Sequence, residues 1–161
     1  MIVAWFDPGL LSGVCVYNFY TQELELLDEF DYKNTGLVLD ADEYGSLLYG
    51  DYEVDFARGN LWVGWENYRI MKGPQTQAPW SLEVIGELKY LCHKYRYTVL
   101  EDADPSWRLV CSDQMIRNLG MYDKIKGKKD AKSALQHFVA WCLRENCLPE
   151  AWRKPVYDTL K

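Results

Sequence analysis

Two short apolar runs that each end in an acidic residue are the clearest pattern in the chain. The first covers residues 2–7 and is followed by Pro8 and Gly9, so it predicts a buried strand that stops at Asp7. The second covers residues 61–66 and ends in Glu66 in the same way. Both runs have the length of a strand. Apolar and polar residues do not alternate in them, which predicts two strands that are buried on both faces.

The other segments complete an α/β pattern. Residues 13–20 and 23–32 are rich in Val, Tyr, Phe and Leu, and the tight reversal between them predicts an antiparallel meander. Residues 81–95 carry apolar side chains at helical spacing, Leu82 among them, and we expect Gly86 to allow close packing against the sheet. The remaining expected elements are a helix broken near Gly45 and Gly50 within residues 36–57, a strand over 97–100, a short helix over 112–119 and an amphipathic helix over 130–143.

Composition limits the class of protein. The 161 residues, 48% of them hydrophobic, predict one domain over 1–161. The opening run lacks a basic leader, and no segment approaches the roughly 20 apolar residues of a membrane span. We therefore expect a soluble cytoplasmic protein with no membrane partner. The five cysteines form no CxxC pair and are odd in number, which favours buried free thiols over a zinc site or disulfides.

Charge is divided between the two parts of the chain. The net charge of −6 argues against a nucleic-acid partner, since such proteins usually present a basic surface. However, residues 1–66 carry 13 acids and 2 bases, whereas residues 67–161 carry 11 acids and 16 bases. Such a division permits DNA to approach a basic face while a carboxylate cluster elsewhere holds cations.

The acids at the strand ends are the candidate chemistry. If the two runs are parallel neighbours, a strand spacing of about 4.8 Å puts Asp7 and Glu66 side by side at one edge of the sheet. Close carboxylates repel unless a cation lies between them, which indicates Mg²⁺ or Mn²⁺. A third acid, Asp130, opens the last long helix, where it would also serve as a plain N-cap.

These motifs resemble those of RuvC-type Holliday junction resolvases. The resemblance rests on Asp7-Pro8-Gly9 and Ser12-Gly13 after the first strand, and it spans most of the chain in family order. The other matching segments are 61–66, 81–86 and 130–135. It implies a ribonuclease H-like α/β fold, with a mixed five-stranded sheet flanked by helices. It also implies a homodimer that nicks opposed strands of four-way DNA junctions during DNA recombination and repair.

The resemblance further implies a two-metal site. Asp7 would bridge the two cations and Glu66 and Asp130 would flank them, giving a 5′-phosphate and a 3′-hydroxyl. The family commonly shows an acid or histidine followed three residues later by Asp in the last helix. Here Gly127 or Ser133 occupies the other place of that pair, so we expect the second metal to depend on substrate phosphate and water, unless Asp113 or Asp123 substitutes.

Several residues are candidates for DNA contact. In the loop after Glu66, Arg69 and Lys72 are candidate contacts with DNA. Tyr68, or alternatively Ile70, is the candidate to stack on a base at a branch point. Tyr68 could equally pack on the protein itself. A lysine run before and within the last long helix suits phosphates but is also compatible with a solvated surface; its members are Lys124, Lys126, Lys128, Lys129 and Lys132. We expect His93 and His137 to be structural, because His137 lies about 10 Å along the helix from Asp130, too far to share a ligand.

Three other functions remain open. An inactive junction-binding module would explain the incomplete acid pair near Asp130. A nuclease of the same fold that acts on flaps or RNA would share the same site. Actin-like sugar kinases and ATPases also end their first strand with Asp and a glycine-bearing turn, but they need two such lobes.

Overall fold

A computed structural model describes residues 1–31, 61–66, 80–100 and 105–161 of the chain. Within them lies a five-stranded sheet in the order β3-β2-β1-β4-β5. β1 pairs with β2 antiparallel and with β4 parallel, so the sheet is mixed. The strands are β1 (Ile2–Asp7), β2 (Leu11–Asn18), β3 (Glu23–Asp31), β4 (Leu61–Trp65) and β5 (Thr98–Val99). The predicted mixed five-stranded α/β sheet flanked by helices is confirmed.

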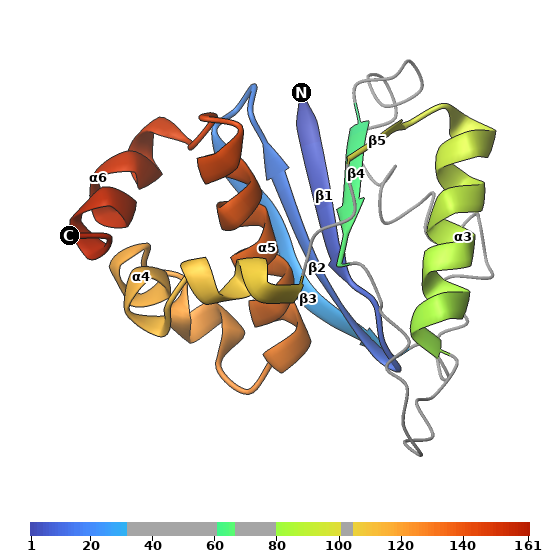
Figure 1. Cartoon of the computed structure of the whole chain (residues 1–161), viewed down its shortest axis with the longest axis horizontal. Coiled ribbons are helices and arrows are strands. Elements are labelled where there is room, and N and C mark those ends of the chain that lie inside the picture. The colour runs from blue at the N-terminus through green and yellow to red at the C-terminus, as the bar shows by residue number, and fades with distance from the viewer. Residues whose placement is uncertain (32–60, 67–79, 101–104) are drawn as a thin grey trace.

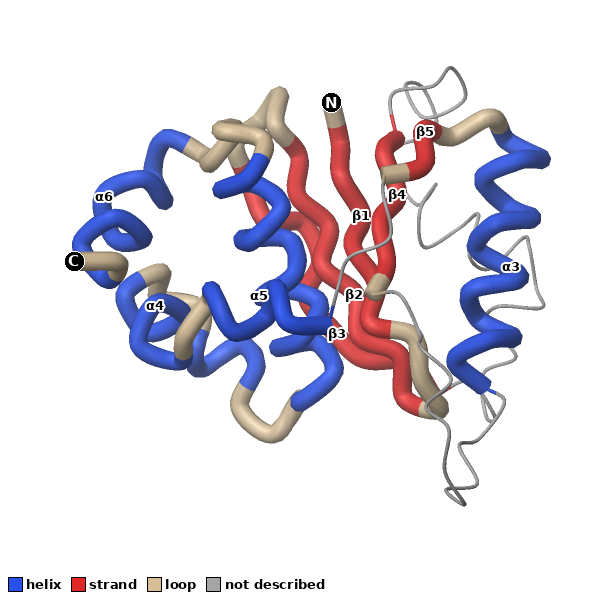
Figure 2. The backbone as a smooth tube through the Cα atoms, in the orientation of Figure 1, coloured by secondary structure: helices blue, strands red, loops and turns tan. Residues whose placement is uncertain are grey.

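Helices cover both faces of the sheet (Figures 1 and 2). Of the described helices, α3 (Trp80–Tyr95) covers one face, and α5 (Lys129–Arg144) packs on the other. The elements on the α5 side also include η2 (Pro105–Val110), α4 (Asp113–Asn118), η3 (Tyr122–Ile125) and α6 (Glu150–Thr159). No helix in these described ranges is long and apolar enough to cross a bilayer.

The alternation of side chains along β1 builds two separate cores. Val3 and Trp5 pack with the residues of α5, whereas Ala4 and Phe6 pack with those of α3. Because side chains alternate along a strand, Asp7 falls on the α5 face. The first strand therefore directs its terminal acid toward the longest helix of that face.

Three expectations about α3 and β5 need correction. Leu82 is 46% exposed and Gly86 faces open space, so neither packs against the sheet. Val84 takes the buried position instead, together with Ile85 and Leu88. The strand expected over 97–100 is reduced to Thr98–Val99, which pair with β4, and Leu100 adds one backbone hydrogen bond to Val63.

Helix α6 was not predicted. Pro149 precedes it, which is compatible with a helix start, but Pro155 lies inside it and argues against a helix in the sequence. Burial of Trp152 and Val156, one turn apart, outweighs that preference.

The cysteine prediction is confirmed, since all five are free. Four of them are buried and Cys147 is partly exposed. Two other expectations, the broken helix over 36–57 and the DNA-contacting loop 67–72, lie outside the described residues.

Gly13 sets the distance between α5 and the sheet. It pairs with Asp7 on β1 and with Glu29 on β3, so these three residues form one row across three strands. A Cβ at position 13 would overlap the backbone carbonyl of Asp130 and the backbone nitrogen of Ala131. The first turn of α5 therefore lies directly on the backbone of β2.

We predict that Gly13→Ala destabilises the protein by about 1 to 3 kcal/mol, because the helix has to move away from β2. Gly86→Ala is the matched control, since a methyl group there meets nothing within 4 Å. It should gain up to about 1 kcal/mol from helix propensity. Urea unfolding measures both, and equal stabilities of Gly13→Ala and the unsubstituted protein would contradict the close approach.

Candidate active site

Asp7 and Glu66 lie next to each other at one edge of the sheet. The parallel register pairs Phe6 with Trp65, so the following residues are neighbours on adjacent strands. The backbone nitrogen of Glu66 donates to the carbonyl of Phe6 at 3.1 Å, which extends the pairing by one residue. The side-by-side placement expected from the two apolar runs is what the structure has.

The surroundings of Asp7 disfavour its charged form. Burial, followed by the negative charge of Glu66, raises its pKa to about 7, and Asp130 adds a smaller effect of the same sign. A hydrogen bond between the two carboxyl groups raises it further, because this bond requires a proton on one of them. The charges that act on Asp7 are thus negative, and in the metal-free protein a proton takes the place of a cation.

Asp130 reaches the site from the first turn of α5. It is not the N-cap, which is Lys128 and has no capping side chain. Glu29 performs that role from β3, since its Oε1 accepts hydrogen bonds from the backbone nitrogens of Asp130 at 2.6 Å and Ala131 at 3.3 Å. The Asp130 carboxyl is therefore not used for capping. Burial and the charge of Glu29 raise its pKa, against a smaller opposing effect of Lys129.

Ser133 occupies one of the two positions, Gly127 being the other, at which the family pattern would allow a second acid. Its buried hydroxyl approaches the Asp7 carboxyl and lowers the pKa of that group, although the two are not in full hydrogen-bonding geometry. Ser133 therefore partly offsets the burial of Asp7 without adding a negative charge.

His137 contacts the site, contrary to the expectation that it is only structural. Its Nε2 lies 2.9 Å from Oε2 of Glu66, and the ring is fully buried. Asp130 is too far along the same helix to share a ligand with His137, but Glu66 reaches the histidine from the end of β4. Together, Asp7, Glu66 and Asp130 come to one edge with two groups that the sequence patterns did not identify, Glu29 and His137.

The predicted phosphate-binding lysines divide into two groups. Lys128 forms an ion pair with Asp28 at 2.6 Å, and Lys132 forms one with Asp113 at 2.5 Å. The other three are exposed, namely Lys124, Lys126 and Lys129. Asp113 is thus engaged with a lysine, and Asp123 is exposed. Tyr68, Arg69, Ile70 and Lys72 lie outside the described residues.

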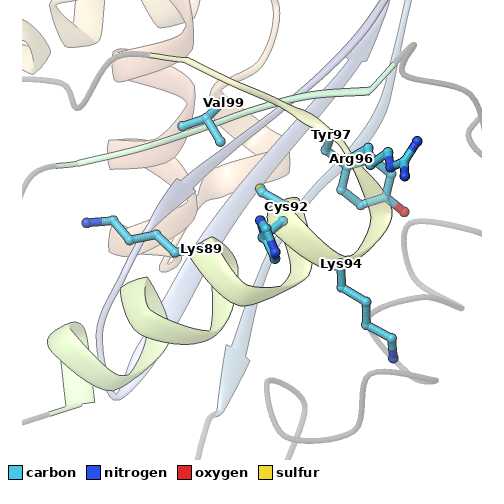
Figure 3. Close-up of a pocket in the computed structure, with 7 residues that line it drawn as sticks. Lys89, Cys92, Lys94, Arg96, Tyr97 and Val99 are labelled. Atoms are coloured by element: carbon cyan, nitrogen blue, oxygen red, sulfur yellow. The ribbon is translucent and has the colours of Figure 1, made fainter.

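A separate hollow of about 750 Å³ lies where α3 meets β5 (Figure 3). Basic side chains at its rim include Lys89, His93, Lys94 and Arg96. Lys89 and Lys94 extend in opposite directions from α3 rather than toward each other (Figure 3). Cations near a helix C-terminus are also favoured by the helix dipole alone, so this hollow does not indicate a second site.

The carboxylate edge has the oxygen chemistry that hard divalent cations prefer. The pKa of Asp7, raised by burial and by the charge of Glu66, shows that a positive charge at this position would relieve repulsion. Among the described residues, however, no three His, Cys, Asp or Glu side chains are arranged closely enough to form a complete metal site. The donor pair fits Mg²⁺ or Mn²⁺, and the metal-ligand roles of Asp7, Glu66 and Asp130 stay predictions.

Comparison with known proteins supports the fold. The structure of T. thermophilus RuvC in complex with a Holliday junction substrate matches with a TM-score of 0.57 at 13% sequence identity. The match covers 91% of this chain and 98% of that chain. No protein-family model and no curated protein matches. At this identity the likeness shows a shared fold and leaves the activity to be argued from the site.

We predict that Asp7→Asn stabilises the metal-free protein more at pH 8 than at pH 4. The fold raises the pKa of Asp7 from 3.8 to about 7, so the folded state keeps a proton that the unfolded chain releases. Stability of the unsubstituted protein therefore falls as pH rises from about 4 to about 7, and the Asn variant escapes this loss. The difference should be roughly 2 to 4 kcal/mol, since a tenfold change in ionisation corresponds to about 1.4 kcal/mol.

Denaturant unfolding in EDTA at both pH values measures this difference. Asp123→Asn provides the matched control, because that carboxylate is exposed and the substitution should change stability by no more than about 0.5 kcal/mol. A pH-independent effect of Asp7→Asn would contradict the burial of a protonated carboxyl group at this edge.

Proposed function

We propose that the chain is a metal-dependent endonuclease that cuts branched DNA, with four-way junctions as its substrate. The observation that carries this proposal is the side-by-side placement of Asp7 and Glu66 at the ends of β1 and β4, with Asp130 of α5 near enough to raise the pKa of Asp7. The likeness to RuvC bound to a Holliday junction supports the choice of substrate class.

Each residue has a role in the proposed site. Both Glu66 and Asp130 raise the pKa of Asp7, so Asp7 is the acid that is close to both of the others. These three carboxylates would hold the metal ions. Bound Mg²⁺ or Mn²⁺ would supply a water activated for attack and stabilise the leaving oxygen of the phosphodiester. Asp7 would have to release its proton before both of its carboxylate oxygens could bind a cation.

The DNA-binding surface is proposed to continue from this edge. The exposed lysines of η3 and of the α5 start, Lys124 and Lys129 among them, would neutralise phosphates near the carboxylates. Tyr68, Arg69 and Lys72 remain proposed contacts at the branch point. A homodimer that nicks two opposed strands completes the proposal, and light scattering with and without junction DNA would measure it.

A synthetic four-way junction with Mg²⁺ or Mn²⁺ tests the activity. We predict nicking by the unsubstituted protein, with 5′-phosphate products, and a loss of at least about 10³-fold in rate for Asp7→Asn without loss of junction binding. Asp123→Asn is the control and should cut normally. Cutting by Asp7→Asn at the unsubstituted rate would overturn the assignment of the site.

A junction-binding module without activity is the second candidate. It is favoured by Gly127 and Ser133, neither of which supplies the second acid of the family pattern, and by the lack of a complete ligand set among the described residues. Tight junction binding with no nicking in either metal would identify it. Parallel assays on flaps, duplexes and RNA-containing branches separate the remaining substrate classes.

The lysine surface gives an independent prediction. Lys126→Ala combined with Lys129→Ala should weaken junction binding and reduce the slope of log affinity against log salt by about 2, because each lost phosphate contact releases one counterion fewer. The matched control is Lys89→Ala with Lys94→Ala, which removes the same charge beside the hollow on α3. Equal slopes for the two double variants would contradict a local contact surface.

A further inference from the structure

His137 is buried directly against one of the proposed metal ligands. Its Nε2 lies 2.9 Å from Oε2 of Glu66. The imidazole side chain is 0% exposed, whereas that of Glu66 is 16% exposed, so the ring lies on the protein side of the carboxylate. The histidine is thus placed to act on Glu66 from behind, away from a ligand that arrives from solvent.

The surrounding packing fixes the plane of this ring. The indole of Trp5 stacks on His137 with 6.4 Å between ring centroids and 15° between planes. Trp5 in turn fits over Gly64 on the neighbouring strand, where any Cβ would overlap the indole. The ring of His137 is therefore held between a rigid aromatic support and the carboxylate.

The hydrogen-bond partners define which nitrogen carries the proton. An ionised Glu66 carboxylate can only accept a hydrogen bond, so Nε2 of His137 is the donor. Nδ1 then carries a lone pair instead of a hydrogen. Nδ1 is buried, and it has no hydrogen-bond partner in the described part of the chain. An apolar side chain would fill this space without the cost of burying a polar ring. The bond to Glu66 is the interaction that sets histidine apart from such a residue.

We propose that His137 is a positioning residue, which holds the Glu66 carboxylate in its metal-binding orientation through the Nε2 hydrogen bond. This inference rests on the proposed function, because it assigns His137 to the same site. A donor on one carboxylate oxygen restrains the rotamer of Glu66, and a carboxylate has further lone pairs with which to bind a cation. Such support from behind a ligand commonly changes metal affinity by about 10- to 100-fold.

Two substitutions separate the donor from the ring. His137→Phe keeps an aromatic ring for Trp5 but removes the donor, whereas His137→Gln keeps a donor at a similar reach. Mn²⁺ affinity, measured by calorimetry on the full chain, should fall about 10- to 100-fold in the Phe variant. In the Gln variant it should stay within about threefold of the unsubstituted value.

The neighbouring Gln136 provides the control on the same helix. Its side-chain amide donates to the carbonyl of Cys111 at 2.7 Å and not to the carboxylate edge. Gln136→Leu should therefore lower thermal stability without changing Mn²⁺ affinity. Unchanged affinity in His137→Phe would overturn the proposal. An equal loss in the Phe and Gln variants would overturn it as well, because the imidazole itself would then be the ligand.

A metal-free measurement keeps the two proposals distinguishable. In ¹⁵N spectra of the imidazole rings, His137 should be protonated at Nε2, and its Nε2 resonance should move in Glu66→Ala. An unmoved resonance would overturn the positioning role even if Mn²⁺ binds. Lack of Mn²⁺ binding by the unsubstituted protein would instead overturn the proposed function, with the hydrogen bond still visible in the spectrum.

Discussion

The contact on which the rest of the structure depends is the backbone approach of α5 to β2 at Gly13. Gly13 lies between Asp7 and Glu29 in a row across the sheet. Because it has no Cβ, the first turn of α5 settles onto this row and Asp130 arrives beside Asp7. Any larger residue at position 13 would lift the helix and separate the acids, whatever the strands did.

Acids crowded in this way need some positive partner, and the fold provides two different ones. Glu29 accepts from the free N–H groups at the start of α5, where the helix dipole also favours a negative charge. Asp7 instead keeps a proton, with a pKa of about 7. A proton with a pKa near neutrality is released at small cost when a divalent cation arrives. The burial that destabilises the metal-free edge thus prepares it for the proposed metal.

The sequence was sufficient to predict the parts that depend on local pattern. Short apolar runs predict the strands that end at Asp7 and Glu66. Because the two runs are similar in length and composition, they also suggest that these strands pair with each other. Glu29 could not be found this way, because the β2–β3 register shifts between Val16 and Tyr17. Without that shift Asp28 would face Gly13, and Glu29 would lie on the opposite face of the sheet. Likewise, His137 depends on how α5 crosses the sheet, which no local pattern determines.

The position of α5 explains how a histidine so far from Asp130 still belongs to the same edge. α5 lies along β2, since Asp130 contacts Gly13 and Phe138 stacks on Tyr17, while His137 of the same helix reaches past β1 to Glu66. Asp130 therefore lies over β2, Ser133 beside Asp7 on β1, and His137 against Glu66 after β4. The helix places one side chain at each strand in turn. Successive turns of one helix, rather than a compact cluster, thus organise the edge, and a serine and a histidine act on the two acids that end the strands.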